Sequence, residues 1–361
     1  FKTWNFSQLV KISNGLRDYS IARKTPRKYQ QHAIDLITEQ IGSKPRCLVM
    51  FATGLGKSII LSEIASFVAS ELKEPVLVLA DKKTLIQQLE QDIWPQLHAN
   101  VKTRLWDGKH KPKSYSGVTV ATYLSVKNAL ERGEDLPKFG AVLVDECHHA
   151  LSPGFLNCLH KLNKSFILGV TATPWRGDNK SLTEYFGNPV ATMGIVEGIS
   201  KGFLAEIDYE MFMDNVNWKA VSSLSKSKMS IKNLNSRLFL PSRDEDMCIQ
   251  IIERWIKLGK PQCITFCKSI DQAERLADLL GSMGMNSRAI HTREKRDSEK
   301  ARIIAHFKAQ KFSNLIGVEI LNEGIDVPDV EMVIFARVTH SRRIFVQQLG
   351  RGLRVTAKNK M

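Results

Sequence analysis

The stretch VLVDECHHA, residues 142–150, places two carboxylates, a thiol and two imidazoles directly after a run of branched apolar residues. Carboxylate oxygens suit a hard cation such as Mg²⁺, whereas thiolates and imidazoles suit Zn²⁺. The side chains that could bind zinc follow no standard zinc spacing; they are Cys147, His148, His149, Cys158 and His160. We therefore favour a magnesium site at Asp145 and Glu146 and keep zinc as the alternative interpretation.

A glycine-rich turn earlier in the chain could hold the phosphates that such a cation accompanies. In FATGLGKSII, residues 51–60, the glycines allow backbone N–H groups to approach phosphate oxygens at the start of a helix. The strict phosphate-loop pattern has glycine where Phe51 stands, so this turn is a shortened version, and an ordinary strand-to-helix turn is the alternative. The predicted nucleotide site comprises Thr53, Gly54, Leu55, Gly56, Lys57 and Ser58.

The charged and hydroxyl groups of these two stretches have distinct predicted roles. Lys57 contacts the β- and γ-phosphates, and Ser58 binds Mg²⁺. Asp145 holds the same ion, mostly through water, and Glu146 orients or deprotonates the attacking water. The predicted chemistry is therefore hydrolysis of a nucleoside triphosphate.

Buried strands must bring the two stretches together. Apolar runs that are typical of strands buried on both faces occur at residues 46–51, 76–80, 118–121, 141–144 and 166–170. Segments with helical spacing, such as residues 58–72 and 84–93, separate them. This alternation indicates an α/β fold with a mainly parallel sheet and helices on both faces. Ligands of such sheets collect at the carboxyl ends of the strands, where Phe51 and Val144 lie.

The alternation stops in a segment rich in Ser, Lys and Asn, at about residues 215–243, and then restarts. Further strands are predicted at residues 262–266, 287–290, 315–318 and 332–335, with helices at 244–258, 271–280 and 294–307. We therefore expect two tandem α/β domains. The predicted divisions are an N-terminal extension (1–25), a nucleotide-binding domain (26–205), a connector (206–243) and a second, C-terminally truncated domain (244–361).

Composition points to a polyanionic partner. Lys and Arg number 52 against 37 Asp and Glu, which gives a net charge of +15 and favours nucleic acid. No apolar run reaches the roughly 20 residues of a membrane span, so no membrane partner is expected. Six scattered cysteines without a C-x-x-C pair indicate a reducing compartment, cytoplasmic or nucleoid-associated. Because the chain begins with Phe1, we expect a piece of a longer protein with accessory domains or subunits.

Four short motifs carry a family resemblance: DECH at 145–148, TATP at 171–174, NEGIDVPDV at 322–330 and QQLGRGLR at 347–354. They resemble motifs II, III, V and VI of the superfamily 2 helicases and translocases, DEXH group, in the family's order. The segments TATPWR and FVQQLGRGLR resemble duplex-DNA translocases, such as restriction-enzyme motor subunits and repair helicases, more than DEAD-box RNA helicases. The resemblance implies two RecA-like domains, with ATP and Mg²⁺ as cofactors.

The resemblance also implies roles for further residues of the first domain. RKYQQ, residues 27–31, resembles the Q motif, in which Gln30 pairs with the adenine edge and Arg27 or Tyr29 packs near the base. A simple helix N-terminus is the alternative interpretation of this segment. His148, Thr171 and Thr173 are implied to link the metal site to the second domain.

In the second domain, the family motifs imply that arginines complete the nucleotide site. Arg351 and Arg354 would act as arginine fingers that neutralise the transferring phosphoryl group, and Gln347 would join this network. Gly324 permits a tight backbone, and Asp326 accepts a hydrogen bond from the ribose. A basic helix that only grips nucleic acid is the alternative.

Basic and hydroxyl side chains in loops at strand ends match the family's nucleic-acid contacts. These groups suit sequence-independent contact with the phosphate backbone. The predicted contact residues are Lys82, Lys83, Thr84, Thr122, Lys268 and His291.

We therefore expect an ATP-driven nucleic-acid motor that prefers duplex DNA and couples hydrolysis at the interdomain cleft to strand tracking. The alternatives are an RNA helicase and an ATP-gated nucleic-acid sensor that does not unwind.

Overall fold

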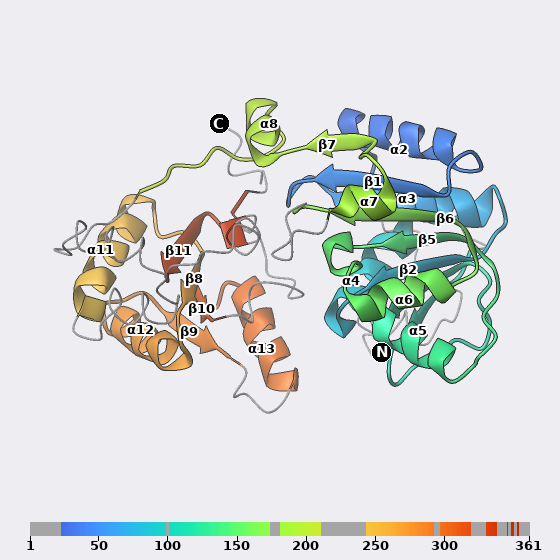
Figure 1. The fold of residues 1–361 in the computed structure, drawn as a ribbon. Helices are drawn as coiled ribbons and strands as arrows, with labels where there is room; N and C mark the ends of the chain where they lie inside the picture. Colours follow the sequence, from blue (N-terminus) through green and yellow to red (C-terminus); the bar gives the residue numbers. More distant parts are fainter. Residues whose placement is uncertain are drawn as a thin grey trace, which may run out of the picture. The chain divides into compact units, whose positions relative to one another are not determined.

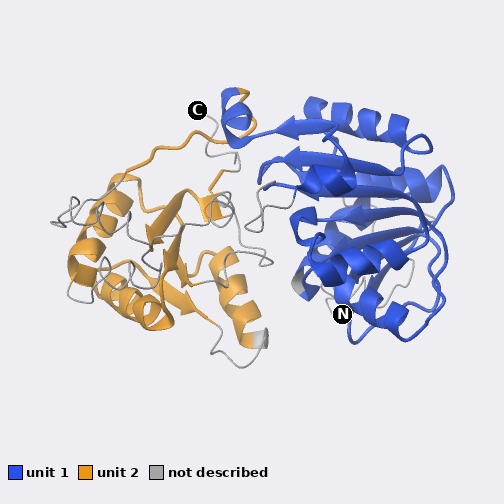
Figure 2. Ribbon diagram, viewed as in Figure 1, with its two compact units in different colours: residues 1–200 blue, residues 201–361 orange. Residues whose placement is uncertain are grey.

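The computed structural model describes residues 23–98, 101–173, 181–210, 243–291, 297–318 and 330–337, together with residues 345, 348, 349, 352 and 353. The chain divides into two compact units, residues 1–200 and residues 201–361 (Figure 2). Each unit has its own parallel sheet and its own buried core. The predicted domain boundaries near residues 25, 205 and 243 remain predictions.

A seven-stranded sheet forms the first unit (Figure 1). Its strands are β1 (Arg46–Phe51), β2 (Val76–Ala80), β3 (Thr103–Trp106), β4 (Val118–Thr122), β5 (Phe139–Val144), β6 (Lys164–Thr171) and β7 (Ala191–Met193). They lie in the order β3-β4-β2-β5-β6-β1-β7, and every pairing is parallel. All the strands therefore end at one edge of the sheet.

Helices pack on this sheet in two groups. The helices of the unit are α2 (Lys28–Gln40), α3 (Lys57–Ser70), α4 (Lys83–Ile93), α5 (Tyr123–Glu131), α6 (Pro153–Lys161), α7 (Leu182–Phe186) and α8 (Ile195–Ser200), with 3₁₀ turns η1 (Trp94–Gln96) and η2 (Cys147–His149). Leu77 and Leu79 of β2 belong to a core shared with α5, α6 and α7. Because side chains alternate along a strand, Val76 and Val78 face the other side, where α3 and α4 contact the sheet.

The second unit repeats this arrangement on a smaller scale. Its described elements are α11 (Asp244–Lys257), β8 (Cys263–Cys267), α12 (Ile270–Ser282), β9 (Ser287–Ile290), α13 (Asp297–Lys308), β10 (Asn314–Gly317) and β11 (Met332–Ala336). The parallel strands lie in the order β11-β8-β10-β9. Cys263 and Cys267 of β8 pack with α11 and α12, whereas Ile264 and Phe266 pack with Phe307 of α13.

The predicted fold class is confirmed: both units are α/β, with parallel sheets and helices of the RecA-like type. β1 and β2 span the residues that were predicted for them, whereas β3 and β7 were not predicted as strands. The predicted helix at 294–307 is observed as α13, which begins at Asp297 and ends at Lys308.

Two observations concern membranes and thiols. Among the described residues, none of the helices combines the length and the apolar character that crossing a bilayer requires. All six cysteines lie in the described parts, and each is buried and free of disulfide bonds.

Gly169 in β6 is tightly packed against side chains of neighbouring elements. A Cβ atom at Gly169 would lie 2.8 Å from the Phe186 ring and 2.9 Å from Sγ of Cys147, both of which are buried. Replacing Gly169 with alanine should therefore destabilise the protein by about 1–3 kcal/mol, measured by thermal or urea unfolding. Gly194→Ala is the matched control, because no atom lies within 4 Å of its added Cβ. Equal stability of the two variants would contradict this packing argument.

Candidate nucleotide site

Three neighbouring strands end where most of the predicted site residues lie. β5, β6 and β1 are adjacent and parallel, so their carboxyl ends share one edge. The register pairs Val144 with Gly169 and Met50 with Thr171. The glycine-rich turn after β1, the DECH stretch after β5 and the end of β6 therefore meet at the edge where open α/β sheets bind ligands.

The glycine-rich turn has a backbone that requires glycine. Gly54 has a φ of +90° and Gly56 a φ of +74°, in the region that other residues rarely adopt. A Cβ at Gly56 would also lie 2.4 Å from Nε2 of Gln30. Lys57 is the first residue of α3, so the turn leads directly into the N-terminal end of that helix, which favours anions.

Helix α2 is bonded to this turn through the segment that resembles the Q motif. Gln30 is 4% exposed; its Nε2 donates to the carbonyl oxygen of Leu55 at 2.9 Å, and its Oε1 accepts from the N–H of Arg27 at 2.7 Å. The hydroxyl of Tyr29 donates to the same Leu55 oxygen at 2.9 Å. In this structure, Gln30 therefore holds the turn in place, and its contact with adenine remains a prediction.

Lys57 faces the carboxylates that follow β5. Its Nζ lies 3.8 Å from Oε1 of Glu146, and the two side chains are 11% and 22% exposed. Burial and the neighbouring Glu146 carboxylate raise the pKa of Asp145 well above its usual range, although Lys57 opposes this change. One ammonium therefore does not compensate two adjacent carboxylates. A divalent cation would supply the missing charge, so this donor set fits Mg²⁺.

Glu146 has an unusual backbone conformation. Its φ of +45° and ψ of +51° are left-handed, which costs on the order of 1–2 kcal/mol for a residue with a side chain. Its Oε2 lies 3.3 Å from Nδ1 of His148 and 3.3 Å from Oγ1 of Thr171. Backbone strain of this kind concentrates at functional sites.

A buried polar network continues from Glu146 to the end of β6. His148 is fully buried, and its Nδ1 lies 2.9 Å from Oγ1 of Thr171 and 3.4 Å from Oγ1 of Thr173. The N–H of Thr173 donates to Oγ1 of Thr171 at 3.1 Å. The structure thus brings the three residues assigned to coupling into one hydrogen-bonded cluster beside Glu146.

Basic residues of the first unit lie farther along the same edge. Lys82 is exposed and precedes α4, and Nζ of Lys83 lies 2.7 Å from Oδ2 of Asp107. Thr122 is buried and caps α5, because its Oγ1 accepts from the N–H of Ser125 at 3.3 Å. The side chain of Thr84 lies outside the described residues.

In the second unit, the described candidates are Lys268 and His291. They follow β8 and β9, whose carboxyl ends share one edge of the second sheet. Burial lowers the pKa of Lys268, and Nε2 of His291 lies 3.0 Å from Oε1 of Glu274. The other candidates, Gly324, Asp326, Gln347, Arg351 and Arg354, lie outside the described residues.

Sequence reasoning missed Asp107, which is 6% exposed. It follows β3, and its bonds to Lys83 and to the amides of Lys109 and His110 outweigh burial, so its pKa lies well below its usual range. The Asp-Gly pair that follows Trp106 is a turn signal that could have marked the end of a strand.

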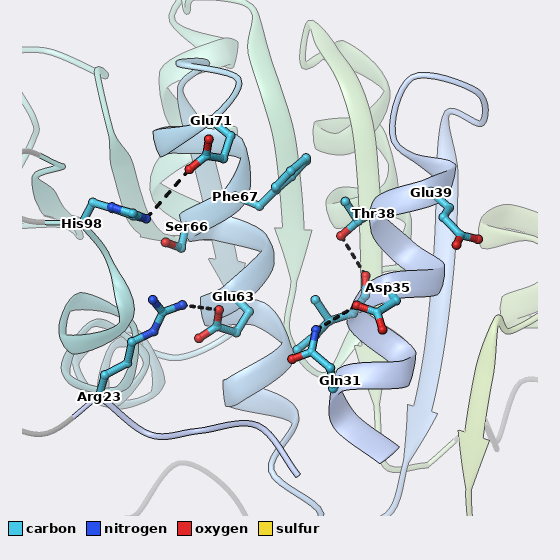
Figure 3. Close-up of a pocket in the computed structure, with 11 residues that line it drawn as sticks. Arg23, Gln31, Asp35, Thr38, Glu39, Glu63, Ser66, Phe67, Glu71 and His98 are labelled. Carbon is cyan, nitrogen blue, oxygen red and sulfur yellow. Dashed lines mark hydrogen bonds and ion pairs between the residues drawn. The ribbon is translucent and has the colours of Figure 1, made fainter. Parts of the chain in front are cut away.

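A cavity of about 540 Å³ lies between α2 and α3, away from the glycine-rich turn. Figure 3 shows Arg23 bonded to Glu63, and Gln31 bonded to Asp35, on the walls of this cavity. None of the predicted site residues lines it.

No group of three or more His, Cys, Asp or Glu side chains in the described part of the chain is arranged to hold a metal ion. Cys147 is fully buried, and burial raises the pKa of its thiol far above the usual range. Cys147 therefore packs beneath the site. Mg²⁺, which keeps several water ligands, needs fewer protein groups than zinc does.

Two family matches cover most of the chain. Residues 23–176 match the family described as "Type III restriction enzyme, res subunit". Residues 245–356 match the family described as "Helicase conserved C-terminal domain".

Individual relatives agree with these families. The chain is 26% identical over 341 residues to a mitochondrial ATP-dependent helicase, irc3, of Schizosaccharomyces pombe, covering 91% of this chain and 55% of the relative. It is 26% identical over 390 residues to the type I restriction enzyme EcoAI endonuclease subunit of Escherichia coli, covering 98% and 47%. The chain thus spans about half the length of these relatives.

A solved structure shows the same fold. A fragment of an HsdR subunit of a type I restriction enzyme from Vibrio vulnificus matches with a TM-score of 0.66 and 23% identity, covering 98% of this chain and 67% of that one. With both family matches in this order and four motifs in place, the chain belongs to the superfamily 2 helicases and translocases of the restriction and repair type.

Proposed function

We propose that the protein is an ATP-driven motor that moves along nucleic acid, with duplex DNA as its preferred track. The observation that carries this proposal is the meeting of Lys57, Asp145 and Glu146 at one sheet edge, with Lys57 and Glu146 3.8 Å apart. Transfer of a phosphoryl group to water requires a cationic side chain such as Lys57, a pair of carboxylates and a glycine-rich turn that binds phosphate. The relatives named as helicase and restriction subunit support the same activity.

In this proposal, the residues of the first unit divide the work of hydrolysis. The turn at residues 53–58 binds the phosphates of ATP, and Lys57 neutralises the β- and γ-phosphates. When bound by Ser58 and Asp145, Mg²⁺ would neutralise further phosphate charge. Glu146 positions the attacking water and accepts its proton.

The second unit would contribute the remaining groups. We propose that Arg351 and Arg354 stabilise charge on the transferring phosphoryl group, and that Gln347 belongs to the same network. Asp326 would accept a hydrogen bond from the ribose, and Gly324 would permit the tight backbone before it. ATP that binds a closed arrangement of the two units more tightly than an open one would favour closure. Hydrolysis would then remove part of this difference in affinity. The cluster of His148, Thr171 and Thr173 is proposed to transmit the change.

The preference for duplex DNA is proposed from the net charge of the chain and from its relatives. A net charge of +15 favours a polyanion, and the restriction-type relative favours DNA over RNA. Lys82, Lys83 and Thr84 of the first unit, with Lys268 and His291 of the second, are the proposed backbone contacts, and Thr122 supports them by capping α5. Further domains or subunits are proposed to set polarity and pathway.

ATP hydrolysis rates in the presence of different nucleic acids test the proposal. We expect duplex DNA to raise the rate several-fold above that without nucleic acid, and more than single-stranded DNA or RNA of the same sequence. Displacement of a triplex-forming strand should accompany this stimulation, because a motor clears the strand as it moves. Greater stimulation by RNA would make the protein an RNA helicase, and hydrolysis without displacement of any strand would make it a sensor.

A further inference from the structure

A buried carboxylate lies among the proposed nucleic-acid contacts. Asp107 directly follows β3, and its side chain is 3% exposed. β3, β4 and β2 are neighbours and run parallel, so Asp107 lies at the same edge as Thr122 and the segment that begins α4. A buried carboxylate costs free energy unless its oxygens are well bonded, so its partners indicate its role.

One oxygen of Asp107 closes a tight turn. Oδ1 accepts from the backbone N–H groups of Lys109 and His110, each at 2.8 Å, and lies 3.0 Å from Nδ1 of His110. The N–H of Asp107 donates to the carbonyl oxygen of His110 at 2.9 Å. These bonds fix residues 107–110, of which Lys109 and His110 are exposed. A turn that exposes Lys109 and His110 is thus held in place at the sheet edge.

The other oxygen of Asp107 holds a lysine. Oδ2 accepts from Nζ of Lys83 at 2.7 Å, and the Lys83 side chain is 44% exposed. Pairs between two exposed side chains contribute little, but here one partner is buried and bonded through both oxygens. An ammonium group carries three donors, and this bond uses one of them. Lys83 can therefore keep its orientation from Asp107 and still donate to a phosphate.

We propose that Asp107 is a positioning residue for nucleic-acid binding, which fixes Lys83 and the turn at residues 107–110 as one unit that binds the phosphate backbone of the track. Lys109 then becomes a further backbone contact. The inference rests on the proposed function and adds to it the group that orders its contacts. In the alternative role, Asp107 competes with phosphate for Lys83, so removing the charge of Asp107 would strengthen the binding of DNA.

Asp107→Asn separates the two roles by the sign of its effect. Asparagine keeps the size of the side chain and an oxygen that can accept the N–H bonds of the turn, but it loses the charge that holds Lys83. The variant is more positive, so long-range electrostatics and the competitor role both predict tighter binding of DNA. The positioning role predicts binding that is roughly 3- to 10-fold weaker, measured by fluorescence anisotropy with a short labelled duplex.

Salt dependence and a second substitution show whether Asp107 acts through Lys83. The slope of log Kd against log salt concentration should flatten by about one for Asp107→Asn and for Lys83→Ala, because each loses one phosphate contact. The double variant should bind no more weakly than Lys83→Ala alone. Additive losses in the double variant would overturn the link between the two residues.

Glu63→Gln is the matched control. It also removes one carboxylate from an ion pair, since Glu63 lies 2.6 Å from Arg23, but it does so in the cavity between α2 and α3. This variant makes the same change in net charge as Asp107→Asn, so it should bind the duplex at least as tightly as the unaltered protein. Weaker binding in both variants would overturn the positioning role.

The remaining outcomes also decide the inference. If Asp107→Asn binds the duplex as tightly as the unaltered protein or more tightly, Asp107 is not a positioning residue. If Asp107→Asn does not fold in a thermal unfolding assay, Lys83→Ala and Lys109→Ala must each flatten the salt slope, and an unchanged slope in either variant would overturn the inference. If the unaltered protein binds no duplex, single strand or RNA, the proposed function fails first, and the inference fails with it.

Discussion

Replacing Glu146 with glutamine should reduce ATP turnover by roughly 100-fold or more while the protein still binds ATP. Glutamine has the same shape, so it can remain near His148 and Thr171, whose side chains lie 3.3 Å from Oε2 of Glu146. Its amide cannot accept a proton from the attacking water. The loss should therefore appear in the rate of the chemical step, whereas the phosphates are still held by the turn at residues 53–58.

The measurement combines steady-state phosphate release, at saturating ATP and nucleic acid, with the affinity for a fluorescent ATP analogue. Glu131→Gln is the control, because Glu131 pairs with Lys127 at 3.4 Å on α5, outside the proposed site. It should hydrolyse ATP at the rate of the unaltered protein. Normal turnover by Glu146→Gln would remove this residue from the catalytic role, whatever the rest of the site does.

Replacing Lys57 with alanine should impair both binding and hydrolysis. The ammonium group at the start of α3 makes charge-assisted bonds to the phosphates in our proposal, and each such bond contributes about 1.5–3 kcal/mol. ATP affinity should therefore fall by roughly 10- to 100-fold, and turnover by roughly 100-fold or more, because negative charge also develops in the transition state. This double loss distinguishes Lys57→Ala from Glu146→Gln.

Equilibrium binding of the fluorescent ATP analogue and phosphate release measure the two effects separately. Lys127→Ala is the control, since it also breaks a lysine–glutamate pair in the first unit, and it should retain both ATP affinity and turnover. If Lys57→Ala bound ATP with unchanged affinity, the glycine-rich turn would not be the phosphate site.

The strands that carry the site were predictable because their composition is unambiguous. β2 is a continuous apolar run and β1 is one from Cys47 onward, and a strand buried on both faces needs such a run. β3 has the sequence TRLW and is only partly buried at three of its four positions, because it lies at the sheet edge. β7 has only three residues. Both strands are defined by pairing with a neighbour, which a local pattern does not reveal.

The chemistry-bearing side chains could likewise be named from the sequence, but their partners could not. The positions of Lys57, Asp145 and Glu146 follow from turns at the ends of buried strands. The bond from Gln30 to Leu55 and the pair between Lys83 and Asp107 join elements that are distant in sequence. The left-handed backbone of Glu146 arises where β5 meets a 3₁₀ turn that no composition signal marks.

The burial of all six cysteines has a practical consequence for labelling this protein with fluorophores. Burial raises the pKa of Cys47 and Cys158 to about 12, so their thiols stay protonated at neutral pH. Alkylating dyes react with the thiolate form and need access to it. A single cysteine introduced on an exposed helix face of either unit would thus take up a fluorophore ahead of the native thiols, without a cysteine-free background having to be built first.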